Sequence, residues 1–295
     1  MKKSLYSLAC ISIMSGVMTT NIVHAESSST SSKIKLVNEN GISISYADYS
    51  RLQSLDFSDD EIKGMEQEEF DMNKDLEGDE VSEQTEYIKV TEQNQDVNSY
   101  STNSVNKSSY KEGNVRARNK KVNVIKEQKM SKTAYLKEVK AAKKKVGQKK
   151  MSIQVSDSTS TSYKTVTTSA IKLSSGKLRV KNRVVWNLMP SNRDVDVIGV
   201  AINDSFAGNK SSAYGKQSWN IYDYDARKYK KGSATYSPSK KASLWDIGDQ
   251  GFGVKMNLKN DDKIILPGTG YIGTEVRESS LYMYYNVGKV FSSVK

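Results

Sequence analysis

The sequence predicts an all-β C-terminal domain, a β-sandwich or jelly-roll-like fold of about eight strands, preceded by a short helical acidic segment and a disordered linker. Three observations support this fold class. From about residue 163 onwards, apolar and polar residues alternate with the period of two that half-buried strands require. All tryptophans and prolines of the 295-residue chain follow residue 150. Net charge divides the chain into −13 over 26–100, +13 over 101–150 and +9 over 151–295.

Residues 1–25 have the pattern of a secretory signal peptide. Two lysines precede an apolar run, and Val23-His24-Ala25 fits a small-residue cleavage site between Ala25 and Glu26. The apolar run is shorter than the ~20 residues that a membrane-spanning helix needs. We therefore expect a secreted protein, either extracellular or associated with the cell surface.

Cleavage at this site would remove the only histidine and the only cysteine, His24 and Cys10. The remaining chain could build neither a Ser–His–Asp triad nor a His/Cys zinc site nor a disulfide. An acidic stretch that begins at Asp71 has Leu76 and Ser82 where an EF-hand loop needs glycine and glutamate. We expect no catalytic residue, no metal and no cofactor, and hence a protein that is not an enzyme.

Residues 26–90 are expected to form an acidic segment with short helices between about 46 and 72. Ser58 and Glu61 have the spacing of a capping box, in which each residue bonds the backbone N–H of the other. Phe57 stands just before the cap, and apolar residues recur at helical spacing on both sides. This segment is therefore predicted to be a small helical element.

Residues 91–160 are expected to form a disordered basic linker. They are rich in Ser, Asn, Thr and Lys and poor in large apolar residues, so they bury too little surface to offset the entropy of ordering. Residues 134–146 have helical character, but lysines nearly encircle them. A helix that is polar all round is seldom stable alone.

Residues 161–295 are expected to form the β-sandwich domain, and Lys177 to Trp186 is its clearest strand. Apolar residues occupy one face of this strand and cations the other. Same-face residues are spaced ~6.6 Å apart, which suits a polyanionic ligand. A solvated sheet face, or cations that protect an edge strand, would give the same pattern. The candidates for binding an anionic surface are Lys177, Arg179, Lys181 and Arg183. Other strands are predicted over about 164–173, 194–202, 217–222, 252–258, 263–266, 270–277 and 281–290.

Three aromatic residues are candidates for contacts with a ligand: Trp245, Tyr282 and Tyr284. Trp245 is expected to be exposed because its neighbours lack a strand pattern. The two tyrosines could stack on sugar rings or lie at a membrane interface. Aromatic residues in strands also fill sandwich cores and pair across strands.

Two parts of the chain resemble secreted proteins of Gram-positive bacteria, most of them of unknown function. The first part runs from Leu52 to Met65 and continues from Phe70 to Leu76, and the second runs from Trp186 to Val200. The resemblance implies a secreted Gram-positive protein. It implies no catalytic residue, ligand or activity.

Three functions are compatible with these features. The first is a secreted non-enzymatic protein that attaches electrostatically to an anionic cell-wall polymer or a membrane surface. The second is a proprotein that loses residues 26 to about 150 and releases a membrane-acting or toxin-like β domain. The third is a carboxylate-dependent extracellular hydrolase, which needs two converging acids. Its candidate pairs are Asp194/Asp196, Asp223/Asp225, Asp246/Asp249 and Glu275/Glu278. Nucleic acid is not expected as the primary partner of an exported chain.

Overall fold

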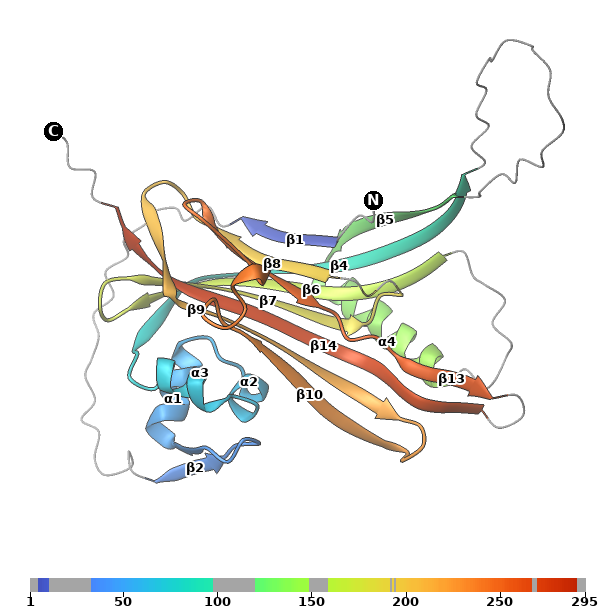
Figure 1. Ribbon diagram of the computed structural model, residues 1–295, viewed down its shortest axis with the longest axis horizontal. Helices are drawn as coiled ribbons and strands as arrows, with labels where there is room; N and C mark the ends of the chain where they lie inside the picture. The colour runs from blue at the N-terminus through green and yellow to red at the C-terminus, as the bar shows by residue number, and fades with distance from the viewer. Residues whose placement is uncertain are drawn as a thin grey trace, which may run out of the picture.

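The computed structural model describes residues 5–10, 33–97, 120–148, 159–191, 193, 195–266 and 270–290. Its largest element is an eight-stranded main sheet with the order β10-β9-β14-β7-β6-β4-β5, in which β13 also pairs with β14 (Figure 1). All of its neighbouring strands are antiparallel. The strands are β4 (Gly78–Val97), β5 (Lys120–Met130), β6 (Thr159–Leu173), β7 (Leu178–Leu188), β9 (Phe206–Asp223), β10 (Lys228–Tyr236), β13 (Asp262–Leu266) and β14 (Gly270–Lys289).

A small sheet lies over one face of the main sheet, and a helical unit covers part of the other (Figure 1). The small sheet has the order β1-β8-β12-β11, with β1 (Leu5–Cys10), β8 (Val195–Ala201), β11 (Trp245–Gly248) and β12 (Gly251–Asn257). A short 3-10 helix, Ala242–Leu244, precedes β11. The helical unit, called the cap below, contains β2 (Ile34–Val37), β3 (Ser43–Ser45), α1 (Tyr46–Ser54), α2 (Asp59–Lys63) and α3 (Gln67–Asn73).

The main hydrophobic core lies between the two sheets. Val180, Val184 and Trp186 of β7 point into it, as the alternation along this strand predicted. They meet Ile198 and Val254 of the small sheet. Burial of such side chains contributes roughly 1.5–3 kcal/mol each. The two packed sheets confirm the predicted all-β fold.

The helices of the cap begin where the sequence predicts. The Ser45 hydroxyl accepts the backbone N–H of Asp48 at the start of α1. Ser58 and Glu61 form the predicted capping box at the start of α2. Apolar cap residues then pack onto the main sheet in a second core. We call the covered side of the main sheet its cap face.

The structure differs from the predicted linker over residues 91–97, 120–148 and 159–160, the last of which begin β6. Strand β4 extends to Val97 and pairs with both β5 and β6, and residues 132–148 form helix α4 (Lys132–Gln148). Polar strands carry little sequence signal, because their stability comes from backbone pairing between neighbours. The rest of the predicted linker, 98–119 and 149–158, lies outside the described residues, as does the predicted cleavage site at Ala25 and Glu26.

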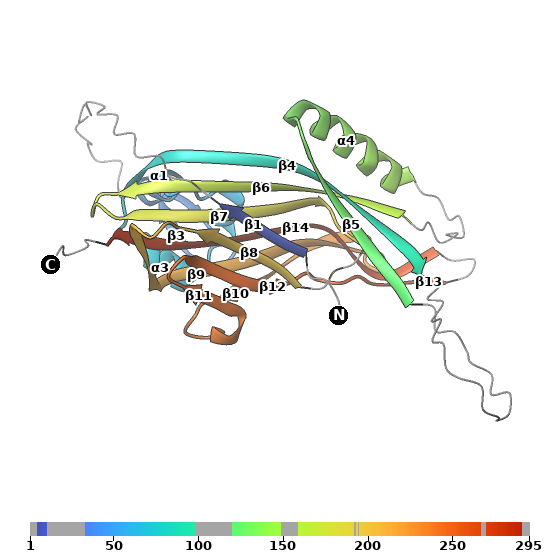
Figure 2. The ribbon, with the colours of Figure 1, turned by 90° about the horizontal axis from the view of Figure 1, so that it is seen from above.

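Helix α4 packs on the cap face at the end of the sheet away from the cap (Figures 1 and 2). Tyr135 and Val139, one turn apart, are buried against Tyr163 of β6. The Tyr135 ring meets the Tyr163 ring edge-on at 5.9 Å between centroids. These contacts supply the tertiary packing that a lysine-rich helix lacks on its own.

Candidate functional site

The four candidate cations on β7 do not form an exposed row, so the predicted binding face is wrong. Arg179 and Lys181 are each only 1% exposed, and Arg183 is largely covered. Only Lys177, in the turn before β7, is exposed. The alternation along the strand was correct, but the cap lies on its cationic face.

Acidic groups of the cap neutralise two of the cations that it covers, Lys181 and Arg183. Glu61 of α2 pairs with Lys181 Nζ at 2.9 Å and with Arg183 Nε at 2.7 Å. Arg183 also contacts the carboxylate of Asp56 at 3.3 Å. Burial alone would raise the pKa of Glu61, but the charges of Lys181 and Arg183 outweigh it and hold the pKa at about 2. The cap is therefore attached through a compensated buried ion cluster.

A second group of polar contacts joins α3 to β7 and β14. Arg179 Nη1 donates to Asn73 Oδ1 at 2.5 Å, and the Asn73 amide donates to the Tyr284 hydroxyl at 2.8 Å. The Tyr282 hydroxyl lies 2.7 and 2.8 Å from the two oxygens of Glu69. Burial raises the pKa of Glu69 to about 7, although the nearby charge of Lys216 opposes this shift.

The three aromatic candidates are also buried, so the expectation that they contact a ligand is wrong. Tyr282 and Tyr284 lie under the cap, where both rings meet Phe57 edge-on. Trp245 packs in the core between the sheets, because β11 pairs with β12 there. The alternative of core packing holds for all three residues.

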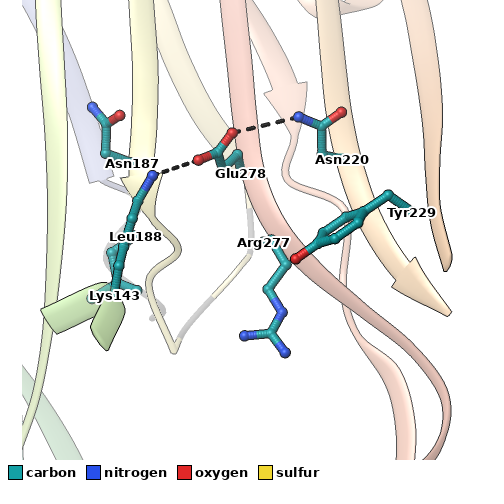
Figure 3. A pocket seen from close by; sticks show the side chains of 7 residues that line it. All are labelled: Lys143, Asn187, Leu188, Asn220, Tyr229, Arg277 and Glu278. Carbon is teal, nitrogen blue, oxygen red and sulfur yellow. Dashed lines mark hydrogen bonds and ion pairs between the residues drawn. The ribbon is translucent and has the colours of Figure 1, made fainter. Parts of the chain in front are cut away.

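A pocket of about 360 Å³ opens on the cap face beside α4. Figure 3 shows Lys143 of α4 on one side, Tyr229 of β10 and Arg277 of β14 on the other, and Glu278 between them. Asn187, Leu188 and Asn220 complete its lining. Because its lining comes from five elements spread between residues 143 and 278, no local motif could have indicated it.

The polar groups of the pocket are partly engaged with one another. Lys143 Nζ lies 2.5 Å from one oxygen of Glu278, and the Asn220 amide donates to the other at 3.4 Å (Figure 3). The Asn187 amide donates to the Tyr135 hydroxyl at 3.0 Å. A carboxylate and two amides within one concavity give acceptors and donors for a hydroxyl-rich or charged ligand.

Exposed cations lie on the two elements that flank this pocket, α4 and the β9–β10 hairpin. Lys137, Lys140 and Lys144 are exposed on α4, and Arg227 and Lys228 on the hairpin. None of these five forms an ion pair with another described residue. Exposed charges without counter-charges raise the local potential and attract anions.

Gly273 of β14 has a left-handed backbone conformation and bonds residues of the β9–β10 turn. Its φ is +82°, its N–H donates to Asp225, and its carbonyl accepts the N–H of Tyr224. A Cβ atom there would lie 2.0 Å from the carbonyl oxygen of Asp262, whereas one at Gly176 (φ +79°) would meet nothing within 4 Å.

Gly273→Ala is therefore expected to lower the free energy of unfolding by more than about 2 kcal/mol, because alanine there strains the backbone and also clashes with Asp262. Gly176→Ala is expected to lower it by about 1 kcal/mol, because alanine there strains the backbone alone. Denaturant unfolding of both variants measures the difference. Equal losses would show that the contact with Asp262 is readily relieved.

Among the described residues, the acid pairs considered for a hydrolase place no free pair at the pocket, and Asp194 lies outside the described residues. Glu275 contacts Lys263, Arg277 and the Tyr224 hydroxyl, and Glu278 contacts Lys143 and Asn220. Asp196 is buried near Trp186, whose indole N–H donates to it at 3.1 Å. Among the described residues, no cluster of three or more acidic, His or Cys side chains could hold a metal.

The described helices include none with both the length and the apolar character needed to cross a bilayer. Comparison of the chain with family models, curated proteins and solved structures gives no match. The function proposed next is therefore inferred from the pocket and its charges.

Proposed function

We propose that the protein is a secreted, non-enzymatic binding protein that holds an anionic polymer of the cell envelope in the pocket between α4 and β10. The observation that carries this proposal is the presence of exposed cations on both elements that flank the pocket. We call these two groups the cationic rims: Lys137, Lys140 and Lys144 on α4, and Arg227 and Lys228 on the hairpin. They replace the buried cations of β7 as the expected electrostatic site.

The shape of the site favours a polymer over a membrane surface. A single extended chain can enter a concavity of about 360 Å³, whereas a flat bilayer contacts only its rim. The partly satisfied Glu278 and Asn220 lie inside the concavity, where an entering chain can reach them. The cationic rims would attract the polymer electrostatically, and contacts inside the pocket would hold it.

The test uses matched triple substitutions. Changing Lys137, Lys140 and Lys144 to serine is expected to weaken retention on purified Gram-positive cell walls about tenfold or more near 0.1 M salt, because three uncompensated charges are lost. The control changes three exposed lysines at the other end of the main sheet and should alter retention less than about twofold. The control lysines are Lys172, Lys177 and Lys210.

Wild-type retention should fall steeply as salt is raised, since exposed charges are screened within ~10 Å at 0.1 M. Retention that is insensitive to salt, or an equal loss in both triple variants, contradicts the proposal. Binding to anionic lipid vesicles without binding to walls would assign the cations to a membrane surface instead.

A further inference from the structure

Four tyrosines form a connected cluster at the end of the main sheet, on the β10 side of the pocket. Tyr222 lies next to Tyr224, with ring centroids 5.0 Å apart, and next to Tyr229 at 5.1 Å. Tyr224 in turn lies 5.2 Å from Tyr271. The rings come from β9, β10, β14 and the β9–β10 turn, so paired strands hold them in place.

Tyr229 is the exposed member of this cluster. Its side chain is 67% exposed and lines the pocket, yet its backbone pairs directly with Tyr222. An aromatic ring on a strand loses little further freedom when a ligand covers it. Tyr229 is therefore a preformed flat apolar surface beside the polar groups of the pocket.

Arg277 places a cation beside these rings. Its Nη2 lies 2.5 Å from Glu275 and donates to the Tyr224 hydroxyl at 3.0 Å, and its guanidinium lies 5.7 Å from the centre of the Tyr222 ring. A guanidinium has five N–H donors, so donors remain for an anionic ligand. Figure 3 shows Arg277 next to Tyr229, across the pocket from Lys143.

A flat ring, a neighbouring cation and nearby hydrogen-bonding groups match three features of a charged sugar. One face of a pyranose ring presents C–H groups. These groups are desolvated when that face stacks on an aromatic ring. Its acidic substituent suits Arg277, and its hydroxyls suit the carboxylate of Glu278 and the amide of Asn220. Polyphosphate offers charge without such a ring.

We infer that Tyr229 and Arg277 form a sugar-binding subsite, so that the polymer held by the pocket is an anionic glycan rather than a chain of phosphates alone. This inference rests on the proposed function, since it names the chemical class of the ligand at the same site. Tyr229 supplies the stacking surface, and Arg277 binds the acidic substituent of the stacked sugar.

The test compares a uronic-acid polysaccharide, polygalacturonate, with polyphosphate by calorimetric titration of the full chain. Tyr229→Ala is expected to weaken binding of polygalacturonate about three- to tenfold and to leave binding of polyphosphate unchanged, because only the sugar loses a stacking partner. Tyr229→Phe, which keeps the ring, should stay within about twofold of wild type. Tyr46→Ala removes a tyrosine that is 46% exposed on the cap and serves as the matched control.

The inference is overturned if Tyr229→Ala weakens the binding of both polyanions equally, or if it weakens the binding of neither. In both cases the triple serine variant of the α4 lysines would still lose binding. The proposed function itself fails if the wild-type protein binds neither polyanion in a salt-dependent way. The two failures are therefore distinguishable in one set of titrations. Circular dichroism of Tyr229→Ala is expected to match that of the wild type, since the substituted side chain is exposed.

Discussion

Replacing Glu61 by glutamine is expected to lower the free energy of unfolding by about 3–5 kcal/mol, because Lys181 and Arg183 then lose their main counter-charge in a buried site. Glutamine has nearly the same shape and can still accept the backbone N–H of Ser58, so the capping contact is largely kept. The loss therefore reports the buried ion pairs rather than the helix cap. Denaturant unfolding at neutral pH measures it.

The neighbouring residue Asp60 provides the matched control. Its side chain is 88% exposed, and the one ion pair that it forms with a described residue, Lys63 at 3.8 Å, is on the surface. Asp60→Asn should change stability by less than about 0.5 kcal/mol. Adding Lys181→Met to Glu61→Gln should recover part of the loss, since it removes one of the uncompensated buried charges. A cost below about 1 kcal/mol for Glu61→Gln alone would show that the cap is not held by these pairs.

The second large effect is a pH dependence that comes from Glu69. Its pKa is about 7 in the folded protein and near 4.5 without the burial, so the folded state holds a proton that the unfolded state releases. The resulting contribution of Glu69 to the free energy of unfolding is fully present below pH 4.5 and is lost as the pH rises through 7. Because each pKa unit corresponds to 1.36 kcal/mol, the loss is about 3 kcal/mol.

Glu69→Gln removes this titration, and its amide carbonyl can still accept a hydrogen bond from Tyr282. The stability of the variant relative to wild type should therefore increase by about 3 kcal/mol between pH 4 and pH 8. Denaturant unfolding of both proteins across this pH range measures the difference in their free energies of unfolding. Other titrating groups, such as Glu61, are present in both proteins, so their contributions cancel in this difference. A difference that is the same at both pH values would contradict a buried, protonated Glu69.

Local patterns in the sequence predicted local structure well. The period-two alternation from Lys177 to Trp186 correctly predicted a strand and the face of it that points into the core. This apolar face is buried against the second sheet, and its burial does not depend on what covers the cationic face. The pair Ser58 and Glu61 predicted the start of α2, because a capping box depends only on residues three apart. The fold class followed from several such strands together.

The sequence could not reveal which faces are covered. The sequence around Arg179 and Lys181 is the same whether solvent or the cap lies above them. Their hydrogen-bond partners in the cap, Asn73 and Glu61, are more than 100 residues away in the chain. Strand β4 was missed because few of its residues are large and apolar, so its place between β5 and β6 depends on backbone pairing. The pocket was missed for a related reason, since Lys143 and Glu278 meet only after α4 and β14 have packed.

The position of β14 also has a consequence for the order of folding. It is the last strand of the described chain, yet it lies between β7 and β9 and provides Tyr282, which Glu69 contacts from 213 residues earlier. The N-terminal cap therefore cannot dock fully until the C-terminal strand has been inserted. Such long-range closure makes folding slow, and until it is complete the cations of β7 and the apolar side of the cap stay open to solvent and to other chains.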